Sequence, residues 1–244
     1  MSVTLLDAGL PRPAAARTYT GRRRVRLADV DEQGRLRLDA IARFLQDVAI
    51  EDVDETGWGL PDHLWFVRRI RIDVTAPFAA DRELELVTWC SGVATVAAGR
   101  RWSLTGDAGG RCEVDSVWIH LGPDGRPARI GDFGPYAAAA AGRSVSARPV
   151  LPGPQADAEQ HAWRVRRTDI DRHGHVNNAV FWQAVEEVLD EPAAPISAQL
   201  DYRAPLDLGD DVRLAVGHDA DGSLDLGFLV GGDLRAAARV EPLS

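Results

Sequence analysis

The sequence predicts an α+β protein made of two tandem copies of one module, each a long helix wrapped by an antiparallel sheet. Three observations lead to this fold class. An eleven-residue segment recurs 140 residues later in the chain. Each copy of that segment is followed by apolar residues at helical spacing, and each helical pattern is followed only by strand-like segments.

The repeat has two landmarks. RVRLADVDEQG at 24–34 and RVRRTDIDRHG at 164–174 are identical at six of eleven positions without a gap. IDVTAPF at 72–78 is echoed by LDYRAPL at 200–206, at an offset of 128. We interpret both pairs as parts of a duplicated module whose second copy is twelve residues shorter between the landmarks.

The first copy is expected to begin with a strand at 22–27, where basic and apolar residues alternate. A short Asp/Gly turn leads into a helix whose apolar positions are Leu38, Ile41, Leu45, Val48 and Ala49. Four strands follow, at 71–74, 83–89, 100–104 and 114–120. The links DAGG and PDG are typical of hairpin turns.

The second copy repeats this order, with a strand at 163–167 and a helix whose apolar positions are Phe181, Ala184, Val185, Val188 and Leu189. Its later strands are expected at 200–203, 212–216, 224–229 and 234–240. Between the copies, 135–160 is rich in Ala, Pro and Gly and is predicted to be a linker with a short helical start at 136–141. We place the boundary near residue 148, giving domains 1–148 and 149–244.

Composition and charge exclude several classes of protein. The formal net charge of −9 argues against nucleic-acid binding. The sequence contains no run of ~18 apolar residues, so no membrane-spanning helix is predicted. Residues 1–19 lack the pattern of a signal peptide. We therefore expect a cytoplasmic protein without membrane association. Cys90 and Cys112 are too few for a disulfide framework or zinc cluster and are expected to be buried in strands. No metal or organic cofactor is expected.

The segment DRHGHVNNAVFWQAVEE at 171–187 resembles the start of the helix in hotdog-fold thioesterases. The first copy, at 25–57, 64–74, 88–92 and 116–130, resembles the N-terminal half of acyl-acyl-carrier-protein (acyl-ACP) thioesterases. This resemblance implies two hotdog modules forming a pseudo-dimer, as a monomer or a homodimer. It also implies hydrolysis of a fatty acyl thioester of acyl carrier protein, or of coenzyme A, to a free fatty acid and a thiol.

The same segment offers the groups that thioester hydrolysis needs. Asp171 precedes a predicted helix and can act as general base on a water or attack the carbonyl directly. The backbone N–H groups of Val176, Asn177 and Asn178 at the helix start can stabilise the oxyanion. His173 and His175 can take part in proton transfer. We predict Asp171, His173, His175 and Asn177 as catalytic residues, with Val176 and Asn178 binding substrate.

Two stretches depart from the family pattern. His173 stands where plant-type members have Asn, and Pro205 and Leu206 stand where they have a Glu-Cys pair. Glu186 and Glu187 on the predicted helix are alternatives for the missing carboxylate. The departures leave open a non-catalytic protein that binds acyl thioesters, and the fold also leaves open a hydratase or dehydratase, which GHVNN at a helix start disfavours.

The first copy lacks the catalytic residues. The residues that match His173, His175, Asn177 and Asn178 are Gln33, Arg35, Arg37 and Leu38. We therefore expect the chemistry in the second copy and an acyl pocket in the first. The candidate pocket residues are Phe44, Val48, Trp65, Phe66 and Trp102. Arginine runs at 22–24, 68–71 and 100–101 are candidates for docking an acidic carrier protein.

Overall fold

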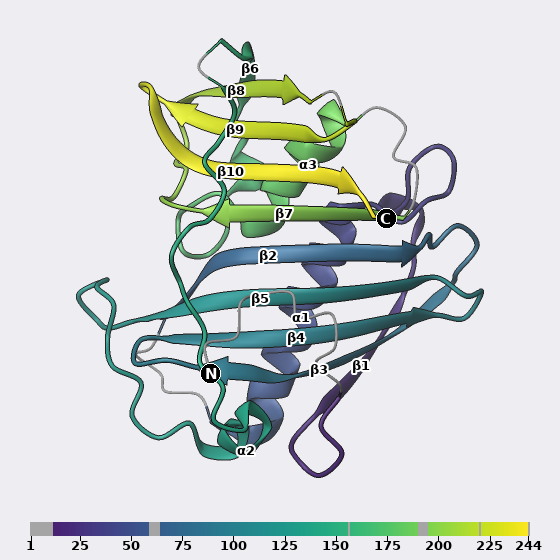
Figure 1. The fold of residues 1–244 in the computed structure, drawn as a ribbon, viewed down its shortest axis with the longest axis vertical. Helices are drawn as coiled ribbons and strands as arrows, with labels where there is room; N and C mark the ends of the chain where they lie inside the picture. The colour runs from purple at the N-terminus through teal and green to yellow at the C-terminus, as the bar shows by residue number, and fades with distance from the viewer. Residues whose placement is uncertain (1–11, 59–63, 156, 190–194, 220, 244) are drawn as a thin grey trace.

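A computed structural model describes residues 12–58, 64–155, 157–189, 195–219 and 221–243. The chain forms one antiparallel sheet of ten strands in the order β1-β3-β4-β5-β2-β7-β10-β9-β8-β6 (Figure 1). The helices α1 (Leu38–Thr56) and α3 (Asn178–Val188) lie behind the strands in this view and contact each other. None of the helices in the described ranges is both long and apolar enough to cross a membrane.

The strand order is a palindrome about the pair formed by β2 and β7, as two copies of one module predict. The strands of the first half are β1 (Tyr19–Arg24), β2 (Leu64–Ala76), β3 (Glu83–Val93), β4 (Ala97–Gly106) and β5 (Arg111–Leu121). Those of the second half are β6 (Glu159–Arg164), β7 (Ile196–Tyr202), β8 (Asp211–His218), β9 (Leu224–Val230) and β10 (Asp233–Pro242). The two halves therefore share one continuous sheet.

Both first strands end earlier than the sequence predicts. The strands expected at 22–27 and 163–167 stop at Arg24 and Arg164, and short 3-10 helices follow, η1 (Leu27–Asp29) and η3 (Arg167–Asp169). The buried carboxylates of Asp29 and Asp169 accept the backbone N–H of Arg26 and Arg166, at 2.8 and 2.7 Å. These bonds close a turn, so the backbone stops pairing with the neighbouring strand after Arg24 and Arg164.

The predicted helical patterns are confirmed. Leu38, Ile41, Leu45 and Val48 of α1 are buried, and α3 buries Phe181, Ala184 and Val185 in the same core. Both helices thus turn one apolar face toward the sheet.

The linker crosses the face of the sheet opposite α1 and α3 (Figure 1). It begins with η2 (Gly134–Tyr136) and α2 (Ala137–Ala140), close to the helical start expected at 136–141. Further on, the backbone N–H groups of Val150 and Leu151 donate to Asp201 of β7, at 2.5 and 2.9 Å. Side chains of the sheet therefore hold the linker in place where the two halves meet.

Candidate active site

A cavity of about 650 Å³ lies between the first half and the loop that precedes α3. Its volume is typical of a pocket for a small ligand. From the second half, Asp171, Arg172, His173, Asn177 and Asn178 line it. From the first half come side chains of α1, the strands β2–β5 and the start of the linker. The cavity therefore brings the predicted catalytic loop of one copy against the helix and sheet of the other.

Most of the cavity wall is apolar and aromatic. The large apolar residues that line it are Ile50, Val53, Trp58, Trp65, Trp118, Phe133 and Tyr136. Small residues line it as well, namely Ala49 of α1 with Ala98 and Gly99 of β4. The lining part of α1 runs from Gln46 to Asp54, about 12 Å at the usual rise per residue. A cavity with this mostly apolar wall suits an acyl chain.

Arg100 of β4 also lines the cavity and is held by a buried carboxylate. Its Nη1 donates to Asp52 Oδ2 at 2.7 Å, and its guanidinium lies 5.6 Å from the ring centroid of Tyr136. The hydroxyl of Tyr136 donates to the backbone oxygen of Asp52 at 3.3 Å, and burial raises the pKa of Tyr136. Tyr136 therefore stays neutral at physiological pH, and Arg100 shares the Asp52 carboxylate with Arg17, which lies 2.7 Å from Asp52 Oδ1.

Asp171 is held in the loop by backbone contacts. Its Oδ1 accepts the backbone N–H of His173 at 2.8 Å, and its own N–H donates to the carbonyl of His175 at 2.9 Å. Its Oδ2 lies 3.5 Å from Asn177 Nδ2, at the outer limit of a hydrogen bond. No salt bridge joins Asp171 to another of the described side chains. The carboxylate is thus oriented but available to accept a proton.

The helix start offers one open donor. The N–H of Val176 donates to the carbonyl of Leu206 at 2.9 Å, and that of Asn177 donates to the carbonyl of Asp169 at 2.8 Å. Within the part of the chain that the structure describes, the N–H of Asn178 has no acceptor. Asn177 caps α3 by accepting the N–H of Ala179 at 2.9 Å. Of the three predicted donors, Asn178 is therefore the one left for a ligand.

His175 lies outside the cavity lining, where a carboxylate that the sequence analysis missed contacts it. His175 Nδ1 is 2.6 Å from Asp207 Oδ1, and both side chains are exposed. Asp207 follows Pro205 and Leu206 directly along the chain. Only the preference of imidazole for a carboxylate partner could have pointed to it.

The predicted pocket residues separate into two groups. Trp65 lines the cavity, while Phe44, Val48 and Trp102 are buried in the hydrophobic core and Phe66 packs against that core. Helical and strand periodicity identify apolar positions but do not distinguish a core contact from a cavity contact.

Cys90 lines the cavity, whereas Cys112 is buried in the core. Burial raises the pKa of the Cys90 thiol, and its Sγ donates to the carbonyl of Gly92 at 3.6 Å. The thiolate form is therefore disfavoured, and Cys90 acts as an apolar wall residue.

Several arginines that were candidates for docking a carrier protein are buried in ion pairs or line the cavity. Arg69 and Arg101 are buried in ion pairs with Asp201 and Asp115, and Arg100 lines the cavity. Arg22 and Arg24 remain exposed.

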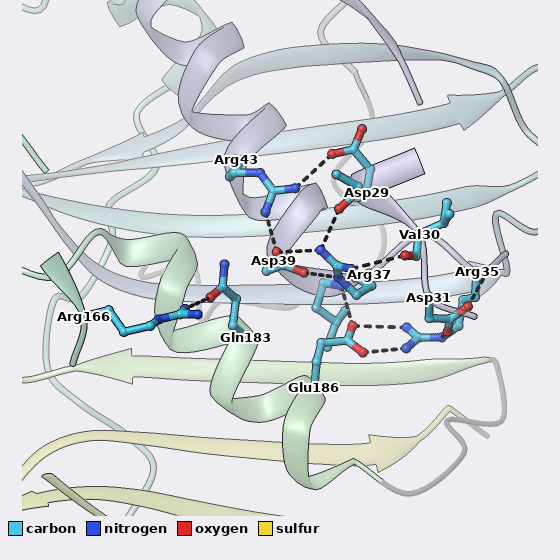
Figure 2. A network of polar contacts seen from close by, with 12 residues as sticks. Asp29, Val30, Asp31, Arg35, Arg37, Asp39, Arg43, Arg166, Gln183 and Glu186 are labelled. Atoms are coloured by element: carbon cyan, nitrogen blue, oxygen red, sulfur yellow. Dashed lines mark hydrogen bonds and ion pairs between the residues drawn. The ribbon is translucent and has the colours of Figure 1, made fainter. Parts of the chain in front are cut away.

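The equivalent site of the first half is closed by internal ion pairs (Figure 2). Glu186 of α3 accepts the N–H of Leu38, the first residue of α1, at 2.6 Å. Arg35 binds Glu186 Oε2 at 2.5 Å and Asp31 Oδ2 at 2.9 Å. The carboxylate that matches Asp171 is thus paired with Arg35, and the helix N–H that matches that of Asn178 is occupied by Glu186.

These contacts predict a purely structural role for Glu186. Glu186→Gln removes the ion pair with Arg35, whose side chain is 17% exposed, and should lower the free energy of unfolding by about 2 kcal/mol. Urea denaturation measures the change. An unchanged free energy of unfolding would show that the closed site contributes no stability.

The family of the chain follows from comparison with known proteins. The family model described as acyl-ACP thioesterase N-terminal domain matches residues 16–132, and that of the C-terminal domain matches 153–231. An uncharacterised protein of Mycobacterium tuberculosis is 33% identical, over 95% of this chain and 95% of its own. Oleoyl-acyl carrier protein thioesterase 1 of Arabidopsis thaliana, a chloroplastic protein, is 26% identical over 73% of this chain and 58% of its own.

Solved structures share the fold over nearly the whole chain. The 12:0-ACP thioesterase from Umbellularia californica superposes with a TM-score of 0.76 at 19% identity, covering 92% of this chain and 96% of its own. An acyl-ACP thioesterase from Bacteroides thetaiotaomicron gives a TM-score of 0.73 at 16% identity, covering 92% and 97%. With both family domains matched in order around the cavity, the chain belongs to the acyl-ACP thioesterase family and is a thioester hydrolase.

Proposed function

We propose that the protein hydrolyses fatty acyl thioesters of acyl carrier protein, or of coenzyme A, at the loop before α3. The observation that carries this proposal is the pairing of an available carboxylate with an open helix N–H at one cavity. Asp171 and Asn178 both line that cavity, and its wall is mostly apolar and aromatic. In the first half the matching groups are paired with Arg35 and Glu186.

In the proposed reaction the acyl chain lies in the cavity and its thioester carbonyl accepts the N–H of Asn178. The N-terminus of α3 stabilises the oxyanion that forms. Asp171 takes a proton from a water whose oxygen attacks the carbonyl carbon. The carbon–sulfur bond then breaks, and the leaving sulfur takes up the proton that Asp171 accepted from the water, which gives a fatty acid and a free thiol and regenerates the Asp171 carboxylate.

His175 and Asp207 are proposed to assist proton transfer near the loop. A carboxylate at Nδ1 holds the imidazole with its proton on that nitrogen, which leaves Nε2 able to accept and release a proton. His173 is exposed and contacts Arg172, with Arg172 Nε at 3.4 Å from His173 Nε2. We assign Arg172 and His173 to the entrance of the cavity, where a cation suits a phosphate or an acidic carrier protein.

The acyl cavity and the catalytic loop are assigned to different modules of the chain. We propose that the two halves are tandem hotdog modules with a boundary near residue 148, the first contributing the acyl cavity and the second the catalytic loop. One chain then forms the pseudo-dimer that builds a single working site.

The acyl cavity makes a testable prediction at Ala98, a small lining residue of β4 that faces Trp118 on β5. In Ala98→Phe the new ring takes space from the acyl chain, so long substrates should lose about tenfold or more in kcat/KM relative to short ones. The measurement is kcat/KM across thioesters of increasing chain length. A profile identical to wild type in a folded variant would place the acyl chain elsewhere.

The function itself is tested by thiol release from a panel of acyl-ACP and acyl-coenzyme A thioesters, from short to long chains. Turnover on a subset of the panel is expected and identifies the carrier and the chain length together. Binding of the thioesters by the folded protein without turnover on any of them would contradict the proposal and favour a non-catalytic binding protein.

A further inference from the structure

Gln46 of α1 reaches from the first half into the catalytic loop of the second. Its Nε2 donates to Asn177 Oδ1 at 3.2 Å, and its Oε1 accepts from Asn177 Nδ2, also at 3.2 Å. Gln46 lines the cavity beside Asn177. The two amides are therefore paired in both directions across the junction of the halves.

This pairing determines which way the Asn177 amide points. Asn177 Oδ1 accepts the N–H of Ala179 and so caps α3, which turns Nδ2 toward Gln46 Oε1 and Asp171 Oδ2. An asparagine alone at a helix start can rotate away from this arrangement. With Gln46 as a second partner, a continuous chain of polar contacts runs from α1 through Asn177 to the carboxylate of Asp171.

The duplicated module shows what a different side chain does at this position. Glu186 stands 140 residues after Gln46, the spacing of the repeat, and reaches from α3 into the loop of the first half. It occupies the N–H of Leu38, the residue that matches Asn178. The glutamine contacts Asn177 instead, which leaves the N–H of Asn178 open.

From these contacts we infer that Gln46 is a positioning residue for thioester hydrolysis. It holds Asn177 so that the amide Nδ2 faces Asp171, and as a neutral side chain it leaves the helix N–H for the substrate oxygen. This inference rests on the proposed function, since it assigns Asp171 and Asn178 their roles.

Gln46→Met tests the inference, because methionine has a similar length and no amide. We expect kcat to fall by about tenfold to a hundredfold through loss of alignment at Asp171. KM and the melting temperature should change little, because methionine fills the same part of the cavity wall and Gln46 is not part of the hydrophobic core. Gln183→Met is the matched control, since Gln183 of α3 contacts Arg166 rather than the catalytic loop.

Gln46→Glu supplies a second readout. A carboxylate there can accept from Asn177 Nδ2 but cannot donate to Oδ1, and its charge disfavours ionisation of Asp171. The acidic limb of the kcat/KM profile should therefore move to higher pH, with part of the activity returning as pH rises. The other titratable groups around Asp171, which stay the same in this comparison, are Asp54, Cys90, Arg100, Tyr136, Arg172, His173, His175 and Asp207.

Measuring Asp171→Asn in the same assay tests the role of Gln46 and the role of Asp171 separately. Wild-type kcat and pH profile in both Gln46 variants, with Asp171→Asn inactive, would overturn the role of Gln46 and leave the proposed function standing. Full activity of Asp171→Asn would overturn the proposed role of Asp171, whereas absence of thiol release from the wild-type protein would overturn the proposed function. If Gln46→Met does not fold, the pH profile of Gln46→Glu decides.

Discussion

Asp171→Asn is expected to lower kcat by about a thousandfold, the scale of a lost general base. Asparagine keeps the shape of the side chain and can still accept the N–H of His173, a contact of 2.8 Å in the wild type. It cannot take a proton from water at neutral pH. The loop and the cap of α3 should therefore persist while the reaction stops.

The measurement is thiol release under saturating substrate, with substrate binding followed in parallel. Binding by the variant should stay close to wild type, because the cavity proposed to hold the acyl chain is lined mainly by residues of the first half. Activity retained in a folded Asp171→Asn protein would move the chemistry to another group, with the His175–Asp207 pair as the next candidate.

Asp201→Ala is expected to cost about 3 to 5 kcal/mol of stability, as the loss of one partner of a buried ion pair does. Asp201 is fully buried where β2 meets β7, and its Oδ1 accepts from Arg69 Nε at 2.8 Å. Its Oδ2 accepts the N–H groups of Val150 and Leu151 from the linker. Alanine leaves the buried guanidinium and both N–H groups without this acceptor.

Urea denaturation of wild type and Asp201→Ala measures the loss. Asp211→Ala is the control, because the Asp211–Arg213 pair is exposed and such pairs contribute about 1 kcal/mol or less. If Asp201→Ala loses no more stability than Asp211→Ala, the junction of the two halves does not depend on this carboxylate.

Much of the fold could be predicted from the sequence because the module occurs twice. The repeated landmarks and the helical spacing around Leu38 and Phe181 indicated two equivalent halves, and the ten-stranded sheet has the matching symmetric order. Strand ends were less predictable. The alternation of basic and apolar residues continues past Arg24 and Arg164. The chain turns there because the side chains of Asp29 and Asp169 accept the backbone N–H groups of Arg26 and Arg166.

The loop proposed to be catalytic could be picked out from the sequence because its residues are close together along the chain, from Asp171 to Asn178. Gln46 and Asp207 could not, since each meets the loop only after folding. Gln46 is 131 residues from Asn177 along the chain, and Asp207 is 32 residues from His175. Local patterns carry no information about such contacts, so both side chains resembled ordinary polar surface residues.

The ion pairs that close the site of the first half could not be predicted from the sequence either. Arg35 and Glu186 are common residue types at unremarkable positions, and their ion pair exists only because α1 and α3 lie side by side. The structure thus explains why one copy keeps Asp31 but pairs it, whereas the other leaves its carboxylate available.

The central claim is that the second copy alone performs the chemistry, and Asp31 and Asp171 are the matched pair that tests it. Thiol release should be measured side by side for Asp31→Asn and Asp171→Asn on the best substrate of the panel. The account predicts that Asp31→Asn keeps most of the wild-type rate while Asp171→Asn loses nearly all of it. Equal losses in the two folded variants, or a greater loss in Asp31→Asn, would contradict it.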